Sequence, residues 1–274
     1  MPDTSTIRPL RVAIAGLGAI GRQVAVALDA GLRGFELAAV SARDLKGASA
    51  FVATLRRPVP AVEIAALEPL ADIVIESAPG AFLDAIAKPF LLKDKTVLVL
   101  SAGALLEASE LIELARSGRG RIIVPSGAIG GLDAVSAAAE GSIHSARIVT
   151  RKPVAALLGA PYLVQNGLEV RGISEPLLIF AGPVREGAKA FPANVNVAAA
   201  LSLAGIGPDR TMQEVWADPT LSCNRHQIEI DADSATLSLT IENIPSVNPK
   251  TGRIVAQSVL ASLRRLAAPL RIGT

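Results

Sequence analysis

The chain is poor in the residues that build disulfides and metal sites. Its 274 residues include one cysteine and two histidines. Cys223 has no partner for a disulfide within the chain, and two histidines far apart in sequence do not suggest a zinc cluster. We therefore expect neither a disulfide framework nor a bound metal.

Net charge and long apolar runs are also scarce. The formal net charge is +2, too small to indicate a nucleic-acid surface. No apolar run approaches the roughly 20 residues of a membrane span, and the first ten residues contain no apolar signal-peptide stretch. These absences predict a cytoplasmic protein that has neither nucleic acid nor a membrane as a partner.

Aromatic residues make up only 3% of the chain, although 50% of it is hydrophobic. The apolar residues are mainly Ala, Val, Leu and Ile, a mixture typical of helices packed on parallel strands that are buried on both faces. A chain of this length is sufficient for two modest domains.

The first 127 residues alternate between short apolar runs and segments with helical spacing. We expect strands at 12–15, 35–40, 73–75, 96–100 and 121–124, and helices at 19–30, 81–92 and 105–116. This alternation predicts an α/β domain with a doubly wound parallel sheet. Ligands bind at the carboxyl ends of such strands, so the loops at 16–21, 78–80, 101–103 and 126–131 are expected to line one crevice.

A glycine motif follows the first expected strand. Residues 16–21 read GLGAIG, which matches G-x-G-x-x-G between a strand and a helix. Gly16 permits the tight turn, Gly18 lets a pyrophosphate approach the backbone, and Gly21 lets helix and strand pack closely. The free N–H groups at the helix start, where Ala19 and Ile20 lie, favour an anion. The motif predicts a dinucleotide-binding domain of the Rossmann type.

The end of the second strand bears on the choice between NAD and NADP. Enzymes strict for NAD carry an acid there, whereas this chain reads VSARD at 40–44, with no carboxylate at the strand tip. Ser41 and Arg43 could accept a 2′-phosphate, so we predict that NADP is accepted, alongside NAD. The alternative is that Arg43 only points to solvent. We expect Ala78, in the loop after the third strand, to be another cofactor contact.

The pattern changes in the second half. Strands are expected at 143–150, 177–181, 212–217, 226–230 and 235–241, with a helix at 193–203. Short links between consecutive strands predict a mainly antiparallel sheet. We expect a second, α+β domain for substrate and subunit contacts at 128–245. The Rossmann domain then comprises 1–127 plus 246–274, whose last helix, 253–266, returns to it.

Six strings, spread in order over nearly the whole chain, resemble the L-aspartate dehydrogenase family. They are PSGAIGGLD at 125–133, TRKP at 150–153, FPANVNVAA at 191–199, LAGIG at 203–207, NRH at 224–226 and NPKTG at 248–252. The resemblance implies NAD(P)-dependent oxidative deamination of L-aspartate to iminosuccinate, or the reverse reductive amination of oxaloacetate with ammonia. It also implies a homodimer or larger homo-oligomer and a place in NAD biosynthesis.

By the same resemblance, His226 corresponds to the family's catalytic histidine. Its cofactor contacts correspond to Ala128 and to Asn196 or Asn194, of which we prefer Asn196 on its spacing to His226. The chemistry agrees, because an amine gives up hydride only when it is neutral and a base near it helps; histidine has an ordinary pKa of about 6.5. A structural or surface role is the alternative for His226, and a helix N-cap is the alternative for Asn194.

The two carboxylates of aspartate require polar partners, and cations suit them best. The substrate candidates are Lys152, Arg225 and Asn194. Two other functions stay open. One is a related Rossmann dehydrogenase that acts on another amino acid, a semialdehyde or a cyclic imine. The other is a dinucleotide-binding regulator without catalysis.

Overall fold

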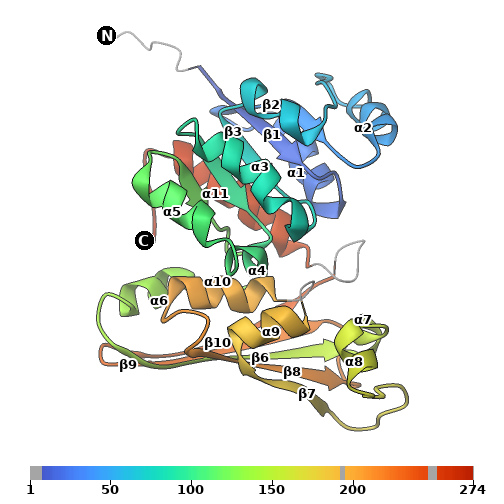
Figure 1. Cartoon of the computed structure of the whole chain (residues 1–274), viewed down its shortest axis with the longest axis vertical. Coiled ribbons are helices and arrows are strands. Elements are labelled where there is room, and N and C mark those ends of the chain that lie inside the picture. Colours follow the sequence, from blue (N-terminus) through green and yellow to red (C-terminus); the bar gives the residue numbers. More distant parts are fainter. Residues whose placement is uncertain (1–7, 192–194, 246–251, 274) are drawn as a thin grey trace. The chain divides into compact units, whose positions relative to one another are not determined.

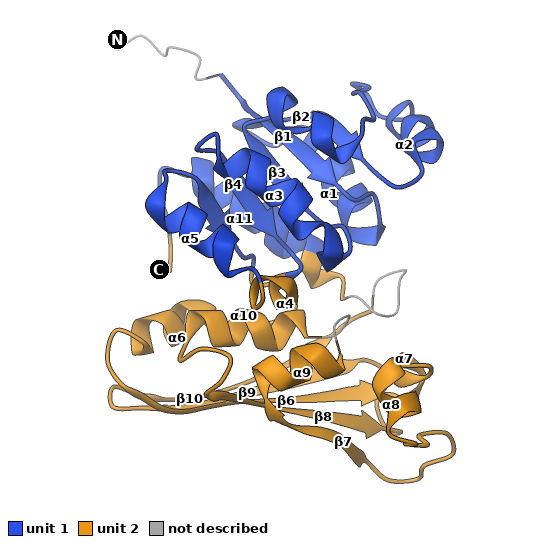
Figure 2. Cartoon of the chain, in the orientation of Figure 1, with its two compact units in different colours: residues 1–101, 108–125, 256–271 blue, residues 102–107, 126–255, 272–274 orange. Residues whose placement is uncertain are grey.

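The chain folds into two compact units (Figure 2). The computed structural model describes residues 8–191, 195–245 and 252–273. Unit 1 comprises Met1–Ser101, Ala108–Pro125 and Ala256–Arg271, and unit 2 comprises Ala102–Glu107, Ser126–Val255 and Ile272–Thr274.

Unit 1 is built on a five-stranded parallel sheet in the order β2-β1-β3-β4-β5 (Figure 1). The strands are β1 (Leu10–Ala15), β2 (Phe35–Ser41), β3 (Ile73–Glu76), β4 (Thr96–Val99) and β5 (Arg121–Ile123). The helices are α1 (Ala19–Asp29), α2 (Leu45–Val52), α3 (Leu83–Leu91), α5 (Ser109–Ser117) and α11 (Ile254–Ala267), with 3-10 turns η1 (Ile64–Ala66), η2 (Glu68–Leu70) and η3 (Gly80–Phe82). The predicted Rossmann-type fold is confirmed.

Both faces of this sheet are buried, which explains the continuous apolar runs of its strands. Ile14 and Ile75 are register partners on one face, where they join a core cluster with residues of α1, α2 and α11. Val74 and Val97 are paired on the other face and are also fully buried. Helix α3 contacts β3 and β4. A ligand can therefore reach the ends of the strands but not a face of the sheet.

Two helical expectations need correction in this region. The helix expected at 105–116 is two helices, α4 (Ala102–Leu105) and α5, separated by a break at 106–108. Helix α2 was not predicted from its short sequence LKGASAFV. It begins at an N-cap, because the Asp44 side chain accepts a hydrogen bond from the Gly47 amide.

Unit 2 is built on a second five-stranded sheet, in the order β10-β9-β6-β8-β7. Its strands are β6 (Ile143–Pro153), β7 (Leu177–Pro183), β8 (Thr211–Asp218), β9 (Asn224–Ala232) and β10 (Thr236–Asn243). Its helices are α4, α6 (Leu132–Ala138), α7 (Val154–Leu157), α8 (Pro161–Gln165), α9 (Val184–Ala190) and α10 (Asn196–Ala204). Residues 193 and 194 of the helix expected at 193–203 lie outside the described residues.

The sheet of unit 2 is mainly antiparallel, as predicted, with one exception. Strand β6 lies between β8 and β9 and pairs with β8 in parallel, while the other three pairings are antiparallel. Strands β8 and β9, which are consecutive in sequence, therefore do not pair with each other. The short link between β8 and β9 predicted that these strands pair. It could not show that β6, from a segment some 60 residues earlier, lies between them.

One face of this sheet is covered by helices, and the other carries charged side chains. Helices α6, α9 and α10 pack on the covered face, where Ile148 and Ile228 belong to the core cluster (Figure 1). On the opposite face Arg147 forms ion pairs with Glu214 and Glu229. This alternation of buried and polar positions is what the period-two pattern of the strands dictates.

Residues 102–107 belong to unit 2, although the sequence division placed them with the Rossmann region. Helix α4 contacts α10, and the Gly103 amide donates a hydrogen bond of 3.1 Å to the Asn196 side-chain oxygen. The segment follows β4 in sequence but packs on a helix almost a hundred residues later.

Candidate functional site

The loop between β1 and α1 has the backbone geometry that its three glycines predict. Gly16 has φ +106°, and a Cβ there would lie 2.5 Å from the Ser77 carbonyl oxygen. A Cβ at Gly21 would lie 2.0 Å from the Gly16 carbonyl oxygen. Only glycine fits at either position, because in both cases the obstacle is backbone.

Gly18 differs from the other two glycines, since a Cβ there would meet nothing within 4 Å. Its φ of −73° is also open to any residue. None of the described residues therefore requires glycine at position 18. The open space in front of the backbone is what a bound pyrophosphate would fill.

Helix α1 begins at Gly18 without a side-chain cap and without an acidic residue in its first turn. The N–H groups of its first turn, which includes Ala19 and Ile20, therefore point out with no carboxylate competing for them. The loop and helix start fit the phosphates of a dinucleotide.

The tip of β2 carries no free carboxylate. Ser41 is buried at the end of the strand, and its carbonyl accepts a hydrogen bond from the Gly16 amide. Arg43 is exposed and makes no hydrogen bond or ion pair with another described residue. Asp44, the nearest acid, caps α2. The residues at this tip are therefore a serine and an available cation.

A buried glutamate, which the sequence analysis missed, joins two loops at the carboxyl ends of the strands. Glu76 ends β3 and is 0% exposed. It accepts hydrogen bonds from the amide of Ala78 at 3.1 Å, and from the amide and hydroxyl of Ser101 at 2.9 and 2.7 Å. Burial raises the pKa of Glu76, although these donors oppose the rise. A carboxylate that ends an otherwise apolar strand was the available signal.

Two of the four loops expected to line a crevice, 16–21 and 78–80, are brought together within unit 1 with Ser101, the first residue of the third loop. Ser77 donates to the Gly16 carbonyl at 2.7 Å, which joins the loop after β3 to the glycine loop. Glu76 joins the loop after β3 to Ser101. The fourth loop, at 126–131, belongs to unit 2.

The covered face of the sheet in unit 2 turns polar at one end. Along β6 the inward residues Ala146 and Ile148 are followed by Thr150 and Lys152, all of them buried. Along β9 the inward residue opposite Thr150 is His226. The register of two strands far apart in sequence therefore brings together a threonine, a lysine and a histidine.

The His226 ring is fixed by Thr150. The Thr150 hydroxyl lies 3.0 Å from the ring Nδ1, so Nε2 is the nitrogen left for other partners. The side chain is 4% exposed. Burial, and after it the charge of Lys152, lowers the pKa of His226 to about 3. The imidazole is therefore neutral near neutral pH.

Lys152 is as deeply buried as His226, at 4% exposed. Burial lowers the pKa of Lys152 to about 8, so that its neutral and charged forms are both accessible near physiological pH.

The predicted asparagines and Ala128 occupy different settings. Asn196 opens α10 and accepts the Gly103 amide. The Ala128 carbonyl accepts a hydrogen bond of 3.0 Å from the Asn243 side chain, whose own oxygen is buried and has no hydrogen-bond donor among the described residues. Asn194 lies outside the described residues.

The structure does not bring Arg225 to the polar end of the covered face. Arg225 forms an ion pair with Glu242, its neighbour on β10, and both side chains are about half exposed. Adjacent residues of a strand point to opposite faces, so Arg225 lies on the face away from His226. The same rule could have been applied to the sequence.

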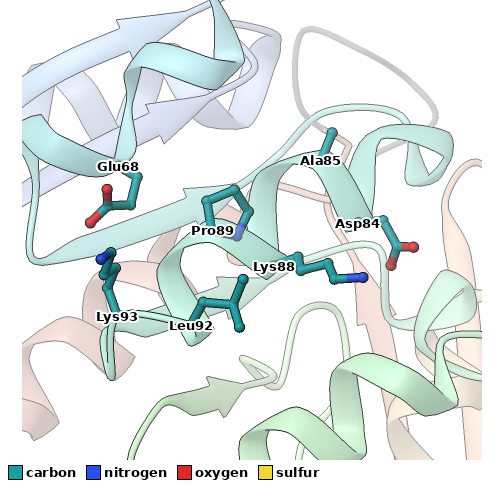
Figure 3. Close-up of a pocket in the computed structure, with 7 residues that line it drawn as sticks. All are labelled: Glu68, Asp84, Ala85, Lys88, Pro89, Leu92 and Lys93. Atoms are coloured by element: carbon teal, nitrogen blue, oxygen red, sulfur yellow. The ribbon is translucent and has the colours of Figure 1, made fainter.

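Other features of the described residues add no further candidate. Within 8–191, 195–245 and 252–273, no group of three or more His, Cys, Asp or Glu is arranged to hold a metal, and no helix is long and apolar enough to cross a membrane. A pocket beside α3 is lined by Glu68, Asp84, Ala85, Lys88, Pro89, Leu92 and Lys93 (Figure 3). None of these residues belongs to the glycine loop, and two of their charges are paired, Lys88 with Glu110 and Glu68 with Lys95.

A glycine loop between a strand and a helix of a parallel sheet defines a dinucleotide-binding domain of the Rossmann type, and the second unit adds a buried histidine and lysine. Residues 16–125 match the family model of the homoserine dehydrogenase NAD-binding domain, and residues 133–266 match that of the aspartate dehydrogenase C-terminal region. The chain is 53% identical to L-aspartate dehydrogenase of Bradyrhizobium diazoefficiens, over 100% of this chain and 98% of the relative. It is 55% identical to L-aspartate dehydrogenase 3 of Bordetella bronchiseptica, over 98% of this chain and 100% of the relative.

The chain therefore belongs to the L-aspartate dehydrogenase family, and the resemblance inferred from its motifs is confirmed. Among solved structures, aspartate dehydrogenase of Thermotoga maritima matches with a TM-score of 0.75 at 24% identity, over 96% of this chain and 99% of the other. That similarity shows the shared fold of the whole chain.

Proposed function

We propose that this protein is an NAD(P)-dependent L-aspartate dehydrogenase, which oxidises L-aspartate to iminosuccinate and catalyses the reverse amination of oxaloacetate with ammonia. The observation that carries the proposal is the full-length identity of 53–55% to relatives of that name. The buried Thr150–His226 pair at the polar end of the sheet supports it, because a fixed imidazole suits an amine substrate.

The glycine loop is proposed to hold the pyrophosphate through Gly16, Gly18, Ala19, Ile20 and Gly21. Ala78 in unit 1, and Ala128 and Asn196 in unit 2, are proposed as further cofactor contacts. The bound nicotinamide dinucleotide supplies the hydride acceptor. Arg43 is proposed to pair with a 2′-phosphate, so that NADP is accepted as well as NAD; its exposure and its lack of a described ion-pair partner support this role.

His226 is proposed as the catalytic residue that contacts the reacting amine. Thr150 orients the ring, and the remaining nitrogen, Nε2, is available to the substrate. Because the ring is neutral, it interacts with the amine by a hydrogen bond and does not repel the substrate ammonium. Lys152 and Asn194 stay proposed substrate contacts. We leave Arg225 out, because it faces away from His226.

Three wider expectations accompany the proposal. A homodimer or larger homo-oligomer and a role in NAD biosynthesis follow from the family resemblance, and a cytoplasmic location stays the prediction made from the sequence composition. Gel filtration with light scattering tests the first of these directly.

The first test of the proposal is formation of reduced cofactor by the purified protein. L-Aspartate is compared with a panel of amino acids and hydroxy acids, with NAD and NADP in turn. Turnover confined to L-aspartate is the expected result. Binding of the dinucleotide without turnover of any substrate contradicts the enzyme assignment, and preference for another substrate contradicts the choice of aspartate.

A further inference from the structure

Lys152 is buried where a lysine is ordinarily not tolerated. Its ammonium form loses hydration inside the unit, and a buried lysine whose pKa is lowered in this way can act as a base. It lies on β6 two residues beyond Thr150, on the covered face, with Ala217 of β8 opposite. Its charge acts on His226 across the same end of the sheet.

Among the described residues of the elements around it, His226 is the titratable group that shares this setting with Lys152. Asp218 of β8 is paired with Arg151, whose position on β6 directs it to the opposite face. On α9, Arg185 pairs with Asp209, and Glu186 and Lys189 are exposed. Helices α7 and α10 carry no ionisable side chain.

We propose that the Nζ amine of Lys152 accepts the proton of the substrate ammonium, while the neutral His226 holds the amine by a hydrogen bond. The inference rests on the proposed function and assigns the base of that reaction. It differs from a role for Lys152 in binding a substrate carboxylate, in which the lysine stays charged throughout.

The proton affinities of the two side chains agree with this division. With a pKa of about 3, His226 is too weak a base to take a proton from an ammonium. With a pKa of about 8, Lys152 is strong enough to accept it and weak enough to release it afterwards. General bases work best when the pKa lies near the working pH.

One N–H bond of the substrate ammonium breaks, and that proton forms a new bond to the lone pair of Lys152 Nζ. The amine lone pair then forms the C=N bond as the hydrogen of Cα leaves with its bonding electrons to the bound dinucleotide. The products are the iminium form of iminosuccinate, reduced dinucleotide and protonated Lys152, which returns its proton to solvent.

Two substitutions separate a base from a carboxylate-binding cation. Lys152→Arg keeps the positive charge but cannot lose its proton, whereas Lys152→Met removes both the charge and the amine that accepts a proton. The control is Lys189→Met, an exposed lysine on α9. Each protein is compared for unfolding temperature, for binding of succinate in the presence of NAD by calorimetry, and for kcat with L-aspartate. Succinate has both carboxylates of the substrate and no amine.

If Lys152 is the base, both Lys152 variants lose about 10²–10⁴-fold in kcat, and both bind succinate within about threefold of the wild type. If kcat stays within tenfold of the wild type in Lys152→Arg, or if succinate binding is lost in Lys152→Met and kept in Lys152→Arg, the inference is wrong and Lys152 binds a carboxylate. The control retains wild-type values throughout.

The wild-type pH profile tests the inference even where a variant does not fold. The base must be deprotonated, so kcat for aspartate oxidation rises with pH and levels off, with a midpoint near the Lys152 pKa of about 8. A midpoint below pH 7, or no rise between pH 6 and 10, overturns the inference. If the wild type binds NAD but does not oxidise aspartate at any pH, the proposed function itself has failed.

Discussion

The two units place their functional residues by different means. In unit 1 the glycine loop is one contiguous stretch of six residues whose motif is visible in the sequence, although the atoms that exclude a side chain at Gly16 belong to Ser77 and Ala78. In unit 2 the polar end of the sheet joins Thr150 and His226, which are 76 residues apart and meet only through strand register. A binding loop can therefore be recognised in one stretch of sequence, whereas a buried reactive cluster requires the complete sheet.

The largest expected effect separates chemistry from cofactor binding. We expect His226→Asn to lower kcat with L-aspartate by about 10²–10⁴-fold, because the imidazole that contacts the amine is lost. The affinity for NAD should stay within about threefold, since the glycine loop belongs to unit 1. Steady-state kinetics and calorimetry measure the two quantities. Equal losses of both would contradict the separation of roles.

Two glycine variants test which positions of the loop require glycine for the fold itself. Gly21→Ala places a methyl group 2.0 Å from a backbone oxygen. We expect it to destabilise the fold by about 3 kcal/mol, which thermal unfolding without cofactor detects. Gly18→Ala has open space, so its unfolding temperature should match that of the wild type.

Cofactor binding then tests whether the open space at Gly18 faces the bound dinucleotide. NAD raises the unfolding temperature of the wild type by mass action. We expect this protection to disappear in Gly18→Ala, because its methyl group occupies the space of the pyrophosphate. Full protection in that variant would show that Gly18 does not face the cofactor.

The pH dependence of stability tests whether His226 in unit 2 is buried and neutral in the folded protein. The folded protein holds His226 at a pKa of about 3, below its ordinary 6.5, so the unfolded chain binds more protons between these values. Stability therefore rises with pH across this window and is lost as pH falls through it. From pH 6.5 to 4.5 we expect His226→Asn to lose about 2 kcal/mol less than the wild type. Denaturant titrations at both pH values measure the difference, and identical losses would mean that His226 titrates normally.

The smallest expected effect concerns the exposed tip of β2. Arg43→Ser should raise the KM for NADP by about tenfold, the equivalent of one charge-assisted contact. The KM for NAD should change less than twofold, because NAD has no 2′-phosphate. Parallel kinetics with both cofactors test this, and equal effects on the two would leave Arg43 without a role in cofactor choice.

Much of unit 1 could be predicted from its sequence, because each strand and the loop that follows it are local features. The strands at 12–15 and 73–75, and the roles of Gly16 and Gly21, all agree with the structure. Glu76 was missed, because a single carboxylate at a strand end does not show that Ala78 and Ser101 will donate to it.

Unit 2 was predictable only in part. His226 was identified through the family resemblance and Lys152 as a cation for a substrate carboxylate, but the sequence did not show that both would be buried or that Thr150 would hold the ring. The parallel pairing of β6 with β8 was also missed, and with it the central position of β6. Arg225 was a candidate as a cation for a substrate carboxylate, and strand alternation places it on the face opposite His226.

By itself the sequence determined the alternation of strands and helices, the glycine loop and the family, because these depend on neighbouring residues and on motif order. Only the tertiary structure decided which side chains share a face and which lose contact with water. Those two outcomes set the pKa values of Lys152 and His226, since desolvation acts only when distant strands and helices close over a side chain.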